Sequence, residues 1–210
     1  MLLALVVAVF LQVPFAQQVQ EAYAQEEADS LEALLSSAES QEDSLLVRYR
    51  LYPLTEDEAV LDPIPRTLSE EASARACALL SGLWSYRAGE TNIFRAIDYG
   101  RHATDLLEKA KEQDPTDPYV LLIEGQSLLF RPSIAGRDPA AAARQFSTLV
   151  EQTEEEENPV GLPRIEAHIW LWMALREADR AKQATALHQR LTSQALPPLY
   201  RQFLRDPPEV

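Results

Sequence analysis

The chain has 210 residues, of which 46% are hydrophobic and 25% are charged, a composition typical of one ordinary globular domain. Six glycines and a single cysteine argue against a small disulfide-stapled fold. The formal net charge of −14 argues against nucleic acid and anionic membrane surfaces as partners, because phosphate binding requires clustered lysine and arginine.

The N-terminus begins with the unbroken apolar run MLLALVVAVFL. This run is too short to span a bilayer as a helix, but it is typical of the hydrophobic region of a signal peptide. The small residues AYA at 22–24 resemble a cleavage site, so we expect residues 1–24 to be removed and the mature chain to begin at Gln25. Cleavage after Ala16 is one alternative, and an N-terminal core helix is another.

Export predicts a periplasmic or secreted protein. A membrane-tethered form is possible only if residues 1–11 are retained, because no other segment of the chain is comparably apolar.

Residues 25–72 are expected to form an N-terminal helix pair and a connector. Apolar residues three and four positions apart indicate one face of a helix. The two stripes are Leu31, Leu34, Leu35 and Ala38, and then Leu45, Leu46, Tyr49 and Tyr52, with the second helix ending at Pro53. The acidic, proline-rich connector over residues 55–71 is expected to be ordered through Val60, Leu61 and Ile64.

The next two helices are predicted from composition and spacing. Residues 71–89 are rich in alanine and leucine, and Gly89 is typical of a C-terminal stop. A second helix is expected to run to Glu112, with an apolar stripe formed by Ile93, Ile97, Leu106, Leu107 and Ala110.

Three Asp-Pro pairs mark helix boundaries. The pair at 114–115 ends a helix, because the residue before proline is pushed out of the α region. The pairs at 117–118 and 138–139 start helices, since aspartate accepts the free N–H groups of the first turn and proline suits the first helical position. The first of these helices is expected to end at Phe130. Capping accounts for these aspartates without a catalytic role.

Towards the C-terminus, residues 151–164 read as an acidic loop. Its four consecutive glutamates lack the spaced oxygens and glycine bend of a calcium loop. Two more helices follow, RIEAHIWLWMALREA and ADRAKQATALHQRLTSQALP, and residues 199–210 are expected to be a frayed tail. No alternating β-branched stretch of any length occurs, so the sequence predicts an all-α fold.

A unit of apolar helix, turn, second helix with small residues and closing proline recurs at a period of about 34 residues. The clearest copy begins at Pro118 and has Leu121, Gly125, Leu128, Ala142 and Phe146 at its key positions. Residues 73–198 therefore resemble tetratricopeptide (TPR) repeats, with about three degenerate copies. The segment LLIEGQSLLFRPSIAGRDPAAAARQF is similar to exported bacterial members of this family and to an accessory subunit of some periplasmic transporters.

The resemblance implies stacked antiparallel helix pairs whose first helices line a concave face. It implies a groove for a peptide or an apolar ligand, with Arg87 and Arg131 as counter-charges. The candidate lining residues are Leu83, Tyr86, Arg87, Tyr119, Leu122, Gln126, Leu129, Phe130 and Arg131. Packing against neighbouring helices is the competing interpretation for the leucines.

No catalytic or metal-binding motif is present. The three histidines, His102, His168 and His188, have no ligand-spaced partner, and Cys77 reads as a small core residue. We expect a non-enzymatic scaffold that binds an unknown protein or peptide, with no cofactor and no metal. One alternative is a ligand-binding transporter subunit, which needs a closed apolar cavity above roughly 300 Å³. The other is a hydrolase, which needs two carboxylates about 5–10 Å apart.

Overall fold

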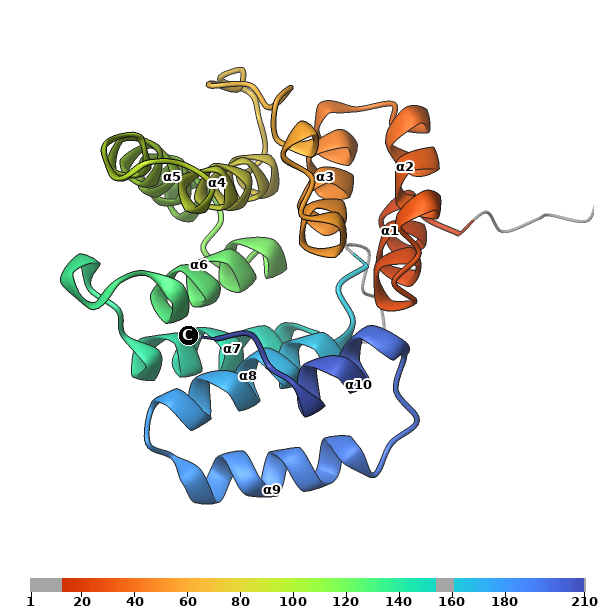
Figure 1. The fold of residues 1–210 in the computed structure, drawn as a ribbon, viewed down its shortest axis with the longest axis vertical. Coiled ribbons are helices and arrows are strands. Elements are labelled where there is room, and N and C mark those ends of the chain that lie inside the picture. The colour runs from red at the N-terminus through yellow and green to blue at the C-terminus, as the bar shows by residue number, and fades with distance from the viewer. Residues whose placement is uncertain (1–12, 154–160, 210) are drawn as a thin grey trace, which may run out of the picture.

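The computed structural model describes residues 13–153 and 161–209. Helices are the only regular secondary structure in this part of the chain (Figure 1). This confirms the predicted all-α class. The α-helices are α1 (Phe15–Ala24), α2 (Ala28–Ser37), α3 (Gln41–Thr55), α4 (Ala74–Gly89), α5 (Ile93–Gln113), α6 (Pro118–Phe130), α7 (Pro139–Gln152), α8 (Arg164–Glu177), α9 (Ala181–Thr192) and α10 (Pro198–Arg205). Two short 3-10 helices, η1 (Glu58–Val60) and η2 (Ser133–Ala135), lie in the loops.

Side-chain caps fix the helix starts as the sequence predicts. The Asp117 carboxylate accepts the backbone N–H groups of Tyr119 and Val120 at 2.9 and 3.3 Å. Asp138 does the same for Ala141 at 2.8 Å. Each cap satisfies N–H groups that have no partner inside the helix, so each Asp-Pro pair sets a sharp boundary.

The helices pack in chain order. α4 lies against α5, α6 against α7, and α8 against α9, while α4 contacts α6 and α6 contacts α8 (Figure 1). Successive helices from α4 to α9 are antiparallel, so α4, α6 and α8 run in the same direction and form one face. This face is the one expected to carry the groove.

The two ends of the chain meet beside that face. α3 packs on α4, α1 and α2, and α10 packs on α1, α8 and α9. Contact between α1 and α10 closes the arrangement (Figure 1). The connector after α3 is held by Val60, Leu61 and Ile64, each less than 9% exposed, which confirms its predicted order.

Two predicted boundaries are wrong. α3 continues through Pro53 to Thr55, because a proline in the last turn removes few intrahelical hydrogen bonds. Residues 198–205 form helix α10 instead of a frayed tail, since Leu199, Tyr200 and Leu204 are buried against the rest of the fold.

Helix α1 also bears on the predicted cleavage site. Val19, Gln20 and Tyr23 are at most 5% exposed, so α1 belongs to the core. A chain beginning at Gln25 would lose these side chains, whereas a cut after Ala16 would keep them. The apolar segment 1–11 itself lies outside the described residues.

Glycine permits the closest approach between α6 and α7. A Cβ on Gly125 would lie 2.5 Å from the ring of Phe146, the aromatic residue that the repeat pattern places opposite it. Gly82 of α4 is similar, because a Cβ there would lie 2.8 Å from the ring of Tyr49 in α3. Both contacts bring neighbouring helices together at positions where no larger residue fits.

We predict that Gly125→Ala lowers the free energy of unfolding by about 1–3 kcal/mol, because the Phe146 ring must move in a filled core. Gly100→Ala is the matched control, since Gly100 is helical and open space surrounds it. Alanine there should raise stability by about 0.5–1 kcal/mol through helix propensity. Urea denaturation of both variants checks this, and equal effects would contradict the packing argument.

Candidate functional site

The face of α4, α6 and α8 is closed. Four residues predicted to line a groove there, Leu83, Tyr119, Leu122 and Leu129, have 0% exposure. They are core residues and do not line an open groove. The competing interpretation, packing against neighbouring helices, describes them correctly.

The occupant of the face is α3 of the same chain. Tyr86 packs against Tyr49 and Tyr52 of α3, with ring centroids 5.7 and 4.9 Å apart. Gln126 accepts a hydrogen bond from the hydroxyl of Tyr49. Two polar residues of the predicted groove, Tyr86 and Gln126, therefore contact a helix of the same chain.

At the centre of this contact lies a buried ion pair. Arg50 of α3 donates Nη1 to Oε1 of Glu166 in α8 at 2.7 Å and Nη2 to Oε2 at 3.2 Å. Both side chains are at most 3% exposed. The guanidinium also lies over the rings of Tyr23, Tyr49 and Tyr119, 4.6–5.5 Å from their centroids. Such a two-point contact is strong only if the remaining lone pairs are also satisfied.

Further donors surround Glu166. Gln20 of α1 donates its Nε2 to Oε2 of Glu166 at 2.7 Å, and the hydroxyl of Tyr200 in α10 donates to the same oxygen at 3.2 Å. The indole N–H of Trp170 reaches Oε1 at 3.4 Å. The carboxylate thus joins α1, α3, α8 and α10, which are far apart in the sequence.

Burial and the neighbouring charges shift the pKa values of Arg50 and of the tyrosines around it. Burial alone lowers the pKa of Arg50, but Glu166 and the tyrosine hydroxyls hold that pKa well above its ordinary value. Burial raises the pKa of Tyr86 to about 12, and it raises the pKa of Tyr49 and Tyr200 well above the ordinary value. The guanidinium and these phenols therefore stay protonated at neutral pH.

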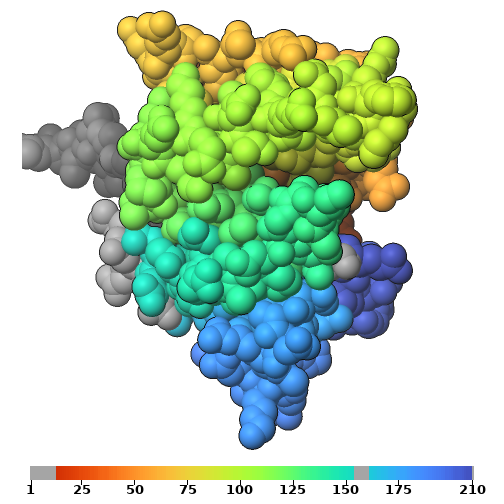
Figure 2. All heavy atoms as spheres, turned by 90° about the vertical axis from the view of Figure 1, so that its left-hand side faces the viewer, coloured from red at the N-terminus to blue at the C-terminus, as the bar shows by residue number. Residues whose placement is uncertain are grey.

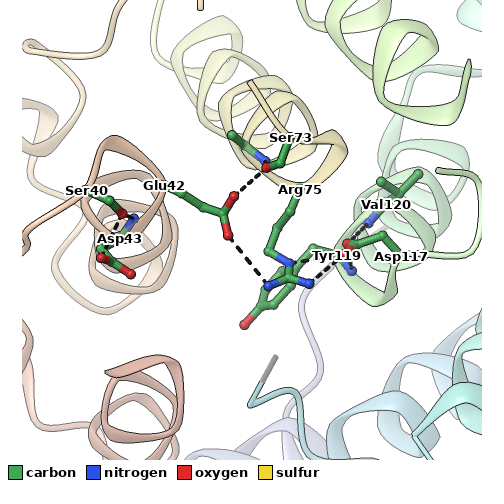
Figure 3. A network of polar contacts seen from close by, with 9 residues as sticks. Ser40, Glu42, Asp43, Ser73, Arg75, Asp117, Tyr119 and Val120 are labelled. Atoms are coloured by element: carbon green, nitrogen blue, oxygen red, sulfur yellow. Dashed lines mark hydrogen bonds and ion pairs between the residues drawn. The ribbon is translucent and has the colours of Figure 1, made fainter. Parts of the chain in front are cut away.

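A hollow of about 410 Å³ opens between α3, the start of α4 and the α5–α6 turn. Its lining includes Glu42, Ser73, Arg75, Asp114 and Asp117. Figure 3 shows Arg75 between the Glu42 and Asp117 carboxylates. The hollow is open and polar, so it lacks the closed apolar walls expected of a small-ligand site.

Every carboxylate in this hollow is engaged. Arg75 donates Nη2 and Nε to Asp117 at 2.8 and 3.1 Å and lies 3.6 Å from Glu42, which also accepts from Ser73 (Figure 3). Asp114 accepts from the Thr116 hydroxyl, and this hydrogen bond lowers the pKa of Asp114. Glu42 and Asp117 thus link α3, α4 and the start of α6 through Arg75, whereas Asp114 stabilises the α5–α6 turn.

Of the six large apolar side chains that are exposed among the described residues, all but Val13 lie at one edge of the molecule. We name this surface the turn edge and define it by Ile93, Phe94, Ile97, Phe130 and Ile134. Phe94 is 83% exposed and Ile134 is 99% exposed. Figure 2 views this side, with the start of α5 (yellow-green) above the α6–α7 turn (green).

The packing of α4 on α6 places these residues together. A Cβ on Gly82 of α4 would lie 3.5 Å from the side chain of Ile123 of α6. These two residues therefore lie at the same height along the two neighbouring helices. Both helices end about two turns further on, so the α4–α5 and α6–α7 turns emerge at the same edge. Of the nine predicted groove residues, Phe130 lies at the turn edge and is 39% exposed.

The two predicted counter-charges have intramolecular partners. Arg87 donates to the backbone oxygen of Leu61 in the connector at 3.1 Å. Arg131 folds back on its own helix and donates to the carbonyl and hydroxyl of Ser127, both at 2.9 Å. No carboxylate among the described residues neutralises Arg131, so it keeps its charge near the turn edge.

Residues 13–153 and 161–209 contain no group of three or more histidine, cysteine or acidic side chains placed to hold a metal ion. No helix in this described part is long and apolar enough to cross a membrane.

Comparison with protein-family models, with curated proteins and with solved structures finds no match.

Sequence reasoning missed Arg50, Glu166 and Gln20. A signal was present, because the positions three and four residues before and after Arg50, which share its helix face, are Val47, Leu46, Pro53 and Leu54. A charge in such a position indicates a buried pair, but only the packing identifies its partner.

We predict that Glu166→Gln lowers the free energy of unfolding by about 3–5 kcal/mol, because it leaves the Arg50 guanidinium buried without a counter-charge. Glu177→Gln is the control, since it breaks the partly exposed pair with Arg137 and should cost less than about 1 kcal/mol. The double variant Arg50→Met/Glu166→Leu should recover most of the loss. Urea denaturation measures all three, and equal losses for the two single variants would contradict the role of the pair.

Proposed function

We propose that the protein is a non-enzymatic, TPR-like scaffold that binds another protein through its turn edge. The repeat pattern in residues 73–198 and the consecutive packing of α4 to α9 support this proposal. Repeat proteins of this architecture offer extended surfaces to partners.

The turn edge is the observation that carries the proposal. Soluble proteins leave isolated hydrophobic residues exposed, but a group of large ones on neighbouring turns is typical of an interaction surface. Ile93, Phe94 and Ile97 belong to the first two turns of one helix, so they present a fixed shape to a partner.

The position of the binding surface differs from the usual one for this architecture. α3 packs directly on α4, and its side chains reach α6 through Tyr49 and α8 through Arg50, which pairs with Glu166. Displacing α3 would separate Arg50 from Glu166 and leave Glu166 of α8 without its counter-charge, at a cost of several kcal/mol. A partner is therefore expected on the outer edge, where the apolar side chains already contact solvent.

We also propose that the protein is exported, with the apolar segment 1–11 as the hydrophobic region of its signal. The buried residues of α1 favour cleavage before Gln17 over cleavage before Gln25, because Gln20 and Tyr23 contribute to the core.

The binding proposal predicts a difference between two baits in affinity purification from the cells that make the protein. The intact chain should recover a protein that the Phe94→Ser/Ile97→Ser variant loses, since both changes remove exposed apolar contacts. Lys182→Ser/Gln183→Ser, which trims exposed side chains on α9, is the control and should recover it. Mass spectrometry measures the ratio, and recovery that is equal for all three baits would overturn the proposal.

The export proposal predicts that the N-terminal residue of the mature protein is Gln17 or lies close to it. N-terminal sequencing of protein recovered outside the cytoplasm checks this. A start at Gln25 would mean that the fold forms without α1, and an intact Met1 would remove the signal peptide.

A further inference from the structure

The turn edge differs in charge from the rest of the chain. Residues 87–101 and 131–138 carry five arginines and three acids, whereas the whole chain has 19 basic and 33 acidic residues. The largest exposed apolar side chains thus occur where an otherwise acidic protein is basic.

Several of these arginines are free to meet a partner. Arg95 and Arg101 are exposed and pair with no carboxylate in the described part of the chain. Arg131 bonds only to Ser127, as described above, whereas Arg137 is neutralised by Glu177 at 2.7 Å. The three local acids are already engaged. Asp98 pairs with Arg66 at 3.4 Å, Glu90 accepts from the Tyr52 hydroxyl at 2.5 Å, and Asp138 caps α7 by accepting from the N–H of Ala141 at 2.8 Å.

The spacing on α5 suits a helical partner. Phe94, Ile97 and Arg101 stand at i, i+3 and i+7, so they share the exposed face of the helix. Gly100 lies one residue before Arg101, and a Cβ there would meet no atom within 4 Å. The missing side chain leaves room for a second helix to approach α5 closely, as in ridge-and-groove packing.

Resting on the function proposed above, we propose that the turn edge binds an acidic amphipathic helix of a partner protein. The partner's apolar stripe packs on Phe94 and Ile97, and its glutamates or aspartates pair with Arg95, Arg101 and Arg131. Charge complementarity favours an acidic partner, because its carboxylates would face the arginines of the turn edge. A basic segment would instead be attracted to the acidic remainder of the surface.

Two other occupants fit less well. A second copy of the chain would need an interface of about 800 Å² on each side, which involves about 20–30 residues, and the turn edge offers far fewer. An anionic membrane surface would attract the same arginines but would repel a chain with a net charge of −14.

The test is selection from a displayed library of random 16-residue peptides on the full-length protein. Enriched peptides should combine Asp and Glu with large apolar residues at i, i+3 or i+4 and i+7. A synthetic copy of the most enriched peptide should bind about tenfold more weakly to Arg95→Glu/Arg101→Glu, as measured by fluorescence anisotropy. Binding to the intact protein should also weaken between low and high salt.

The control variant Arg144→Glu/Arg190→Glu makes the same change in net charge at exposed positions of α7 and α9 and should bind as the intact protein does. Enrichment of basic or neutral peptides, no enrichment, or equal loss in both double variants would overturn the acidic-helix proposal. Dimerisation in light scattering that Phe94→Ser abolishes, or binding to anionic but not neutral lipid vesicles, would overturn it in favour of the other occupants.

The two proposals fail in different ways. If capture from cells depends on Phe94 and Ile97 but the peptide selection shows no acidic preference, the scaffold function stands and the partner chemistry is wrong. If capture is independent of these residues, the scaffold function fails whatever the peptides do.

Discussion

The contact between Arg50 and Glu166 determines how the ends of this chain are arranged. Two charges removed from water are stable only when they face each other and when nearby donors satisfy the remaining oxygen lone pairs. Gln20, Tyr200 and Trp170 supply those donors from α1, α10 and α8. The pair therefore requires the N-terminal, central and C-terminal helices to be in place together.

This arrangement shapes what the protein can bind. Once α3 lies on α4, α6 and α8, their common face is an interior, and its leucines become core residues. Large apolar side chains remain exposed at the edge where helices turn, in the first turns of α5 and in the α6–α7 loop. Phe130 still packs against Trp170 of α8, with ring centroids 6.0 Å apart, whereas Phe94 and Ile134 are 83% and 99% exposed. The binding proposal rests on these exposed side chains.

Local chemistry made most of the helices predictable. Asp117 and Asp138 accept N–H groups of the turn that follows, and Gly89 ends α4, so these boundaries need no information from distant residues. The pairing of Gly125 with Phe146 was also readable, since it belongs to one repeat unit. The groove was misjudged because the apolar face of a helix looks the same whether solvent, a ligand or another helix covers it.

The sequence by itself determined the all-α class, the starts of the central helices and the small residues at their crossings, because each depends on neighbours within about 30 positions. Tertiary structure alone decided that α1 and α10 belong to the core, that Arg50 meets Glu166 across 116 positions, and that α3 fills the shared face. Those outcomes depend on which surfaces remain uncovered after the local helices form, and a linear pattern does not contain that information.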